Sequence, residues 1–529
     1  MKVKEESTSA SFMILTAATF IMKIMSLVFV PVLLYLIGAE AHGIYTTAYE
    51  YFAFIYVVTN EGLTKGIARM VSERMAREDI AGAHGVFRIA RRILGGIGVG
   101  SGIIFFILAR PLSEVAEAPE SLVAMQILAP AIILTSISSA YRGYFQGRRQ
   151  LAVTAKSQIW EQVAHVIISL GFAAFFIPMG IRYGVAGAAS GTLAGAIISV
   201  IYLIVIYRKT GSSEPRQLPK SSEDKGIVRA LLSFTIPLTL GTAATQFGNV
   251  IDLINVKSRL IVSGLTEAGA NITYSYLSSY KTMIAVPLTV VTALTVSIFP
   301  TLARAAALGN RDEVRRIYEM SLKICYLIVL PSAAGLYAVA GPANVAIYDG
   351  DPQRGLLIAL GSFVVIFTGI TGLQTVLLQA EGLQRISLIP LISGIAVKIA
   401  ANYFLVAVPS LRGQGAIIGS YLHGIVTILL NEYFIRTRLN LKAEHGRFIL
   451  KPALGGLGMG LLLIAARWIL PDPSGRLANG LQLLLLVALG VVSYSFLLIV
   501  TGGLQKEDFN AVRPGLSDRL PGFISRYLR

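Results

Sequence analysis

Four ionisable side chains lie deep inside long apolar runs of this chain: Lys23, Asp252, Lys281 and Lys398. A charge at the centre of a membrane helix costs about 2.5–3.5 kcal/mol, so such residues normally face a cavity or an oppositely charged partner. Three of the four are cations, which predicts a binding site for an anionic group, with Asp252 orienting a lysine or coupling an ion. The alternative for Lys23 and Lys398 is a structural ion pair between helices.

A second set, Glu61, Lys65 and Arg69, recurs every four residues and therefore shares one helix face. We expect Glu61 and Arg69 to contact the cargo and Lys65 to act as a gate. The alternative is that the two basic side chains extend to the inner membrane surface.

The stretch from Tyr141 to Gln162 joins two apolar runs and is rich in charge. Arg142 and Glu161 are predicted to form a gate at the inner mouth of a cavity, although Glu161 could equally cap the helix that it begins. Arg148 and Arg149 need no role beyond fixing the orientation of the loop.

The predicted site suits phosphate, because lysine and arginine make charge-assisted hydrogen bonds to it. A cationic drug is disfavoured by the same charges. The chain has no GxxxxGK[ST] motif and no Cys/His cluster with metal-ligand spacing, so we expect no cofactor. The remaining driving forces are the membrane potential, coupling to Na⁺ or H⁺, or consumption of the cargo on the far side. Moving one negative charge outward gains about 2.3 kcal/mol per 100 mV.

The elements that hold these residues are membrane helices. Hydrophobic residues make up 54% of the 529, charged residues 14%, and the mean hydropathy is +0.67. Apolar runs of about 20 residues predict an all-α polytopic membrane protein. Fourteen spans are expected, at about 11–37, 43–68, 93–112, 122–145, 157–178, 184–207, 228–254, 272–300, 318–346, 355–380, 386–408, 414–435, 448–470 and 478–501.

Lysine and arginine sort by side of the membrane. With the N-terminus cytoplasmic, thirty-three of the 46 lie in the inner connections and tails, eight, including Lys257 and Arg354, lie outside, and five lie in spans. This asymmetry predicts that both termini are cytoplasmic. It also explains the net charge of +17 without nucleic acid. The outer connections are short, which argues against an enzyme.

A polar linker, KTGSSEPRQLPKSSEDKG, divides the chain. Residues around Arg69 and Arg304, and around Gly147 and Gly382, resemble each other at a spacing of 235. Two six-span repeats with parallel topology would enclose a cavity at their interface. The predicted division is an N-lobe at 1–210, a cytoplasmic linker at 211–227, a C-lobe at 228–440, two further helices at 441–503, and a basic amphipathic tail at 504–529.

The segment GYFQGRRQLAVTAKSQIWEQ resembles the signature of polysaccharide transporters of the stage V sporulation protein B/YtgP type, in the multidrug/oligosaccharidyl-lipid/polysaccharide flippase superfamily. LLYLIGAEAHGIYTTAYEYF, EGLTKGIARMVSERMA and NVIDLINVKSRL match as well. The resemblance implies fourteen helices in two lobes and export of lipid-linked sugars, including lipid II by MurJ-like members. It implies that Lys23 matches the first of the essential basic residues in span one of MurJ-type proteins, whereas Phe29 replaces the second. It also implies that Lys281 lies within about a residue of a basic position in their span eight, and that Glu61-Gly62 matches their acidic-glycine pair in span two.

Together these features predict a flippase of the bacterial inner membrane that moves an undecaprenyl-pyrophosphate-linked saccharide outward by alternating access. Its expected partners are that substrate and membrane lipids, with no nucleic acid. We expect a monomer that works beside cell-wall synthesis proteins. A cation-coupled drug antiporter and a non-transporting scaffold for wall or spore-cortex synthesis are the two alternatives.

Overall fold

The computed structural model describes residues 8–211, 221–442, 445–470 and 473–503, which form α-helices joined by short turns without any strand. The first half contains α1 (Thr8–Tyr56), α2 (Gly62–Ala76), α3 (Ile80–Val115), α4 (Leu122–Gly147), α5 (Leu151–Phe176), α6 (Ile181–Gly211) and α7 (Ser221–Val262). The rest contains α8 (Glu267–Ala307), α9 (Arg311–Ile347), α10 (Pro352–Gly361), α11 (Val364–Ala380), α12 (Gln384–Leu405), α13 (Gly413–Leu439), α14 (His445–Ile469) and α15 (Arg476–Val500). Most of the predicted linker and all of the predicted tail lie outside the described residues.

The all-α membrane fold is confirmed. Among the described residues, twelve helical segments are long and apolar enough to cross a membrane, or thirteen if the bent helix α7 counts as one span. The longest segment, Ile24–Ala76, contains a break at Gly38, whose φ of 81° lies in the left-handed region. It therefore holds two of the predicted spans, so about fourteen spans fit the structure. Helices dominate because each satisfies its own backbone hydrogen bonds, which lipid cannot do.

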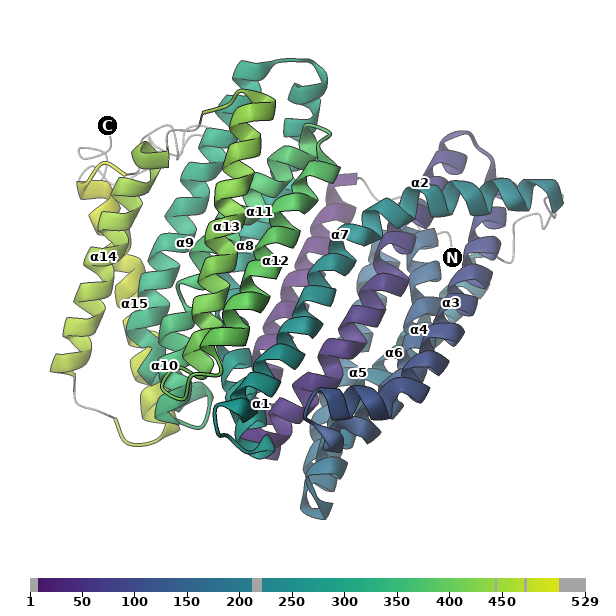
Figure 1. Cartoon of the computed structure of the whole chain (residues 1–529). Coiled ribbons are helices and arrows are strands. Elements are labelled where there is room, and N and C mark those ends of the chain that lie inside the picture. Colours follow the sequence, from purple (N-terminus) through teal and green to yellow (C-terminus); the bar gives the residue numbers. More distant parts are fainter. Residues whose placement is uncertain (1–7, 212–220, 443–444, 471–472, 504–529) are drawn as a thin grey trace. The chain divides into compact units, whose positions relative to one another are not determined.

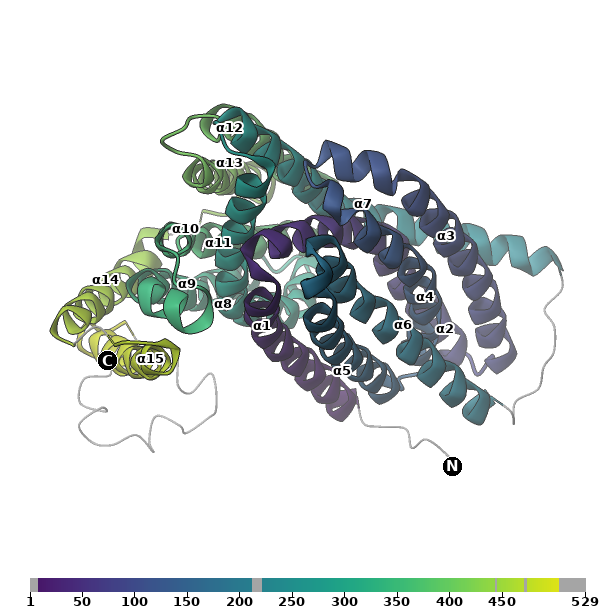
Figure 2. The same ribbon diagram turned by 90° about the horizontal axis from the view of Figure 1, so that it is seen from below.

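Packing divides the chain into two compact units, Met1–Ser275 and Tyr276–Arg529. In the first unit α5 packs along α6, and α4 packs against both α3 and α6 (Figures 1 and 2). In the second unit α12 packs along α13, and α9 packs against α14 and α15. The lobe boundary at 211–227 stays a prediction, and it concerns the sequence repeat, whereas these units are defined by packing.

The repeat is visible in the turns. After α2 and α8 the chain makes the same left-handed turn at Glu78 and Gly309, and the next residue, Asp79 or Asn310, caps the following helix. Asp79 accepts a hydrogen bond from the Gly82 amide at 2.7 Å, and Asn310 accepts one from the backbone amide three residues on at 3.1 Å. The two caps are 231 residues apart, four fewer than the predicted spacing.

A second turn repeats in the same way. Arg149 follows α4 with a φ of 58°, and Gly382 follows α11 with a φ of 77°. Each is flanked by the same pair of backbone hydrogen bonds to the end of the preceding helix. These residues are 233 apart, so the structural counterpart of Gly382 is Arg149. The predicted pairings at a spacing of 235 are therefore wrong in register, although the repeat itself recurs turn by turn.

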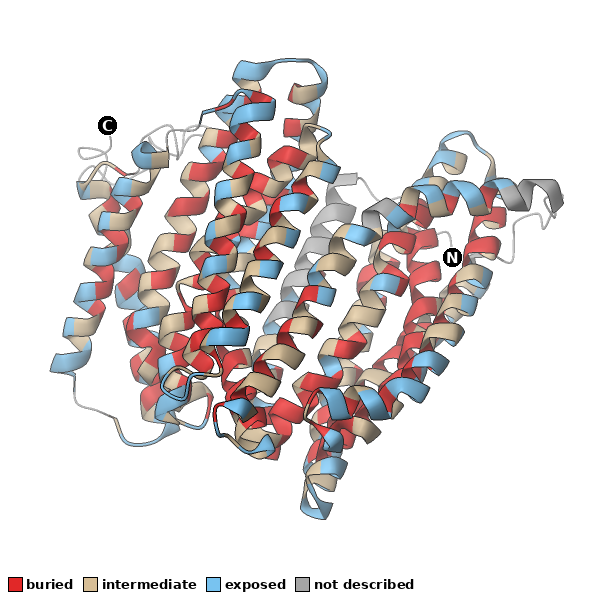
Figure 3. Ribbon diagram, in the orientation of Figure 1, coloured by how far each residue is buried: buried red, intermediate tan, exposed pale blue. Residues whose placement is uncertain are grey.

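Within each unit the buried positions gather on one side of a helix (Figure 3). The opposite sides expose large apolar residues, as on α15, where Leu477, Leu481 and Leu484 are each more than 60% exposed. Such surfaces are tolerated where the surrounding solvent is lipid.

Candidate functional site: charged pairs inside the membrane helices

Helix α2 begins at an irregular turn that displays the Glu61–Lys65 pair. Residues Val57–Glu61 form a π-helical turn between α1 and α2, and such turns occur often at functional sites. Within it, the Asn60 Nδ2 atom donates to the Tyr56 carbonyl at 2.9 Å, while the buried Asn60 Oδ1 atom has no hydrogen-bond partner among the described residues. Nothing in the sequence signals this π-turn.

The three charged residues of this helix form two separate pairs. Lys65 Nζ donates to Glu61 Oε1 at 2.8 Å, as their spacing of four predicts. Arg69 turns the other way and pairs with Glu73 at 2.8 Å, with its guanidinium 4.5 Å from the centroid of the Phe234 ring of α7. These side chains are between 36% and 57% exposed, so a charged ligand could compete for them without a large desolvation cost.

Arg142 and Glu161, the predicted gate pair, are in direct contact. Arg142 Nη2 of α4 donates to Glu161 Oε2 of α5, and the same guanidinium donates to Ser157 Oγ at 3.0 Å and to Ser199 Oγ of α6 at 2.8 Å. Only 8% of the Arg142 side chain is exposed, against 26% of Glu161. Arg142 therefore links three helices, while Glu161 keeps an accessible edge.

Aromatic and imidazole side chains surround Glu161. It lies ten residues into α5, about 15 Å along the helix axis. Tyr49, Tyr56 and His165 are all within electrostatic range of its carboxylate. Tyr56 is also within electrostatic range of Glu61 and Arg142, so it is near charges of both ion pairs. We call Tyr49, Tyr56, Arg142, Glu161 and His165 the Glu161 cluster.

The remaining predicted residues are placed as follows. Asp252 is buried in α7, with 5% of its surface exposed. Lys281 in α8 and Lys398 in α12 are half-buried and belong to the second unit. Lys23 lies on α1, but its side chain is outside the described part of the chain. The structure thus joins Glu61 to Lys65 and Arg142 to Glu161, and it leaves the joint role of the three lysines as a prediction.

A family model described as "Polysaccharide biosynthesis protein" matches residues 9–306, which is more than half of the chain. The chain belongs to this family. The family match includes the first unit from residue 9 onward and every residue of the Glu161 cluster. It ends within α8, just after Arg304.

Two relatives from Bacillus subtilis extend the match. Stage V sporulation protein B is 25% identical over 422 residues, covering 79% of this chain and 81% of the relative. Lipid II flippase MurJ is 20% identical over 540 aligned positions, covering 97% of each chain. The solved structure of "Lipid II flippase MurJ, inward closed conformation" superposes with a TM-score of 0.68 at 15% identity, covering 92% of this chain and 98% of that one. At that identity the superposition shows a shared fold. The long apolar helices make this family member a multi-pass membrane protein.

Sequence reasoning missed the burial of two basic residues of this family member. Lys257 was assigned to an outer connection, but α7 continues to Val262, so Lys257 is fully buried and donates to Thr47 Oγ1 at 3.1 Å. A lysine three residues beyond the expected end of a span gave no signal of burial, because connections of that kind normally hold exposed cations.

Arg354 was also assigned to an outer connection and is also fully buried. Its Nε and Nη2 atoms donate to both oxygens of Asp349 at 2.9 Å, and Nη1 donates to Ser279 Oγ at 2.6 Å. Its guanidinium carbon is 4.3 Å from the centroid of the Tyr276 ring. Burial alone would raise the pKa of the Asp349 carboxyl, but the paired guanidinium outweighs it and holds that pKa below its usual value. The motif DGDPQR, with an aspartate five residues before the arginine, was the available signal.

Proposed function

We propose that this protein is a flippase that moves an undecaprenyl-pyrophosphate-linked saccharide from the inner to the outer leaflet by alternating access. The observation that carries the proposal is the relation to lipid II flippase MurJ, which extends over 97% of both chains at 20% identity. The predominance of lysine among the deep charges supports an anionic cargo.

In this proposal each charged set has its own role. Lys23, Lys281 and Lys398 bind the pyrophosphate, while Asp252 orients a lysine or couples an ion. Glu61 and Arg69 contact the cargo as it enters, because their side chains are accessible and each already has a partner of opposite charge.

The gate role of Lys65, Arg142 and Glu161 is supported by their contacts. Glu161 is held on one side by the buried Arg142 and keeps an accessible edge on the other. A change in the packing of α4 against α5 would change that contact, which is what a gate requires. The driving force is the membrane potential, Na⁺ or H⁺.

The decisive experiment uses proteoliposomes that contain the purified protein and fluorescent lipid II. The replacement Lys23→Ala is expected to abolish the appearance of the label in the outer leaflet. Lys209→Ala, at the exposed C-terminal end of α6, is the matched control and should transport normally. Transport by Lys23→Ala at the parental rate would remove this lysine from the mechanism. A parental protein that flips no lipid-linked saccharide would favour a scaffold.

The proposed orientation, with both termini cytoplasmic, has a separate test. Cys325 is the chain's single cysteine and is buried, so a background of Cys325→Ala changes no exposed thiol. Arg77→Cys in the α2–α3 turn and Glu120→Cys in the α3–α4 turn place thiols at exposed positions on opposite sides. In intact cells a membrane-impermeant maleimide should label only the second, and the reverse pattern would invert the proposed topology.

A further inference from the structure

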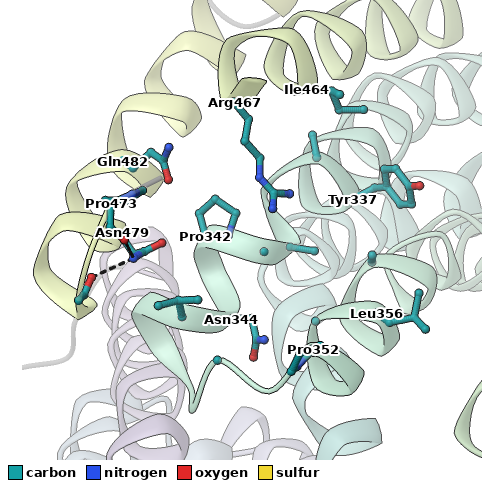
Figure 4. Close-up of a pocket in the computed structure, with 18 residues that line it drawn as sticks. Tyr337, Pro342, Asn344, Pro352, Leu356, Ile464, Arg467, Pro473, Asn479 and Gln482 are labelled. Carbon is teal, nitrogen blue, oxygen red and sulfur yellow. Dashed lines mark hydrogen bonds between the residues drawn. The ribbon is translucent and has the colours of Figure 1, made fainter. Parts of the chain in front are cut away.

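A cavity of about 650 Å³ lies in the second unit, at the ends of α9, α10, α14 and α15 (Figure 4). Arg467 of α14, Asn344 of α9 and Gln482 of α15 line it, together with Tyr337 and Leu356. Its volume is within the range of small-molecule sites, and it involves none of the residues assigned to the proposed transport path.

Two buried amides in its lining have unmet hydrogen-bonding capacity. The Asn344 side chain is 3% exposed, and its Nδ2 atom donates to the Asp351 carbonyl at 2.7 Å, but its Oδ1 acceptor has no partner within the described chain. The Gln482 side chain is 7% exposed, and its Nε2 donor likewise has no partner there. A buried polar atom without a partner costs about 1–3 kcal/mol, so an acceptor and a donor facing one cavity point to a bound polar group.

Arg467 supplies a positive charge to the same space. No ion pair or hydrogen bond of its guanidinium is found among the described residues, and the group lies directly over Gly341, where an added Cβ would be 2.7 Å from Nη2. The nearby carboxylates are engaged elsewhere, since Asp349 pairs with Arg354 and Asp351 caps the first turn of α10. Among the described residues the cavity therefore presents a cation with no carboxylate partner.

The surroundings place this cation at the depth of lipid headgroups. Trp468, the next residue, is 87% exposed, and tryptophan is enriched at the membrane–water boundary. Ile469 and Leu477, at the facing ends of α14 and α15, are more than 80% exposed, which offers an apolar surface for acyl chains. With the termini cytoplasmic, as proposed above, this is the outer leaflet.

We propose that the cavity binds the headgroup of an anionic phospholipid that carries a hydroxyl, for which phosphatidylglycerol is the natural probe. The phosphate accepts from the Arg467 guanidinium and from Gln482 Nε2, and a headgroup hydroxyl donates to Asn344 Oδ1. The acyl chains lie along the exposed apolar face of α14 and α15. A bound lipid would hold these two helices to α9, and it would satisfy both unpartnered amides at once.

The test is lipid binding to the purified full chain by native mass spectrometry, with phosphatidylglycerol and phosphatidylcholine compared at equal concentration. Arg467→Gln is expected to weaken phosphatidylglycerol binding about tenfold to a hundredfold, the range for a lost charge-assisted hydrogen bond. Gly341→Ala, which pushes the guanidinium out of its place, should weaken binding in the same direction. Arg182→Gln, an exposed arginine at the start of α6, is the matched control and should bind normally.

Three results would overturn the proposal. These are equal binding of the two lipids, unchanged phosphatidylglycerol binding by both cavity variants, and displacement of the lipid by millimolar glycerol phosphate, which would indicate a soluble ligand instead. Because the readout is binding and not transport, a failure here leaves the proposed flippase function intact, and a failed transport assay leaves this lipid site intact.

Discussion

Replacement of Glu161 by glutamine tests whether the Arg142 network stabilises the first unit. Removing one partner of a buried ion pair costs about 3–5 kcal/mol, because the other charge stays buried. Here Glu161 is 26% exposed, and Ser157 and Ser199 still accept from Arg142 in the variant. These two facts reduce the expected loss for Glu161→Gln to about 2–3 kcal/mol of unfolding free energy.

The assay is reversible unfolding of the purified protein in mixed micelles, followed by circular dichroism. The control is Glu114→Gln in the pair Arg110–Glu114, whose side chains are 79% and 58% exposed, so its loss should be at most about 1 kcal/mol. The double replacement Arg142→Met with Glu161→Leu removes both charges and should be more stable than Glu161→Gln alone. Equal losses for the buried and exposed pairs would refute the reasoning.

Three further predictions follow from contacts in the first unit. Gly43→Ala should lower the unfolding free energy by about 1–3 kcal/mol, since its Cβ would overlap a backbone carbonyl of α8. Gly96→Ala is the control and should not be destabilising, because the space around its Cβ is open. Equal shifts in the thermal unfolding of the two variants would contradict this. Thr47→Val should cost about 1–3 kcal/mol because it removes the hydroxyl that accepts a hydrogen bond from the buried Lys257 ammonium, and unchanged denaturation would show that another group satisfies this lysine. Asp79→Ala should lower the unfolding free energy by about 1 kcal/mol, because it removes a helix cap. The Gly82 amide and Arg74 lower the pKa of Asp79, so the parent's extra stability should be present above about pH 4 and should fade as the pH falls through the lowered native pKa. A difference in unfolding free energy that does not change with pH would contradict this.

The helices were predictable because their lengths are fixed by the apolar runs that must cross the membrane. Which charged residues pair with one another was harder to predict. The spacing of four placed Glu61, Lys65 and Arg69 on one helix face, and the structure pairs Glu61 with Lys65. It pairs Arg69 with Glu73, a residue that sequence reasoning had not singled out. Arg142 and Glu161 were both identified, yet their contact depends on how α4 packs against α5, which no local pattern encodes.

Whether a charged residue is buried was harder to predict than where the helices lie. Sorting lysine and arginine by side assumes that a basic residue beyond a span faces water. Lys257 violates the assumption because α7 extends eight residues past the predicted end, and Arg354 violates it because Asp349 and Ser279 supply its hydrogen bonds inside the unit. The burial of these two residues leaves the charge asymmetry that predicts the topology in place, because it concerns only two of the 46 basic residues.

The register of the repeat shows that identical residue types are weaker evidence for equivalent positions than identical backbone conformations. Gly147 and Gly382 suggested a spacing of 235, but they meet different physical requirements. Gly147 ends α4, where an added Cβ would be 2.7 Å from the Ala68 carbonyl, so it is needed for close approach to α2. Gly382 has open space around its Cβ and is needed for its φ of 77°. The residue that repeats the conformation of Gly382 is Arg149, which accepts some backbone strain to make the same turn. Turn geometry is therefore the better guide to equivalent positions in the two halves, and functional residues carried from one half to the other should be aligned on it.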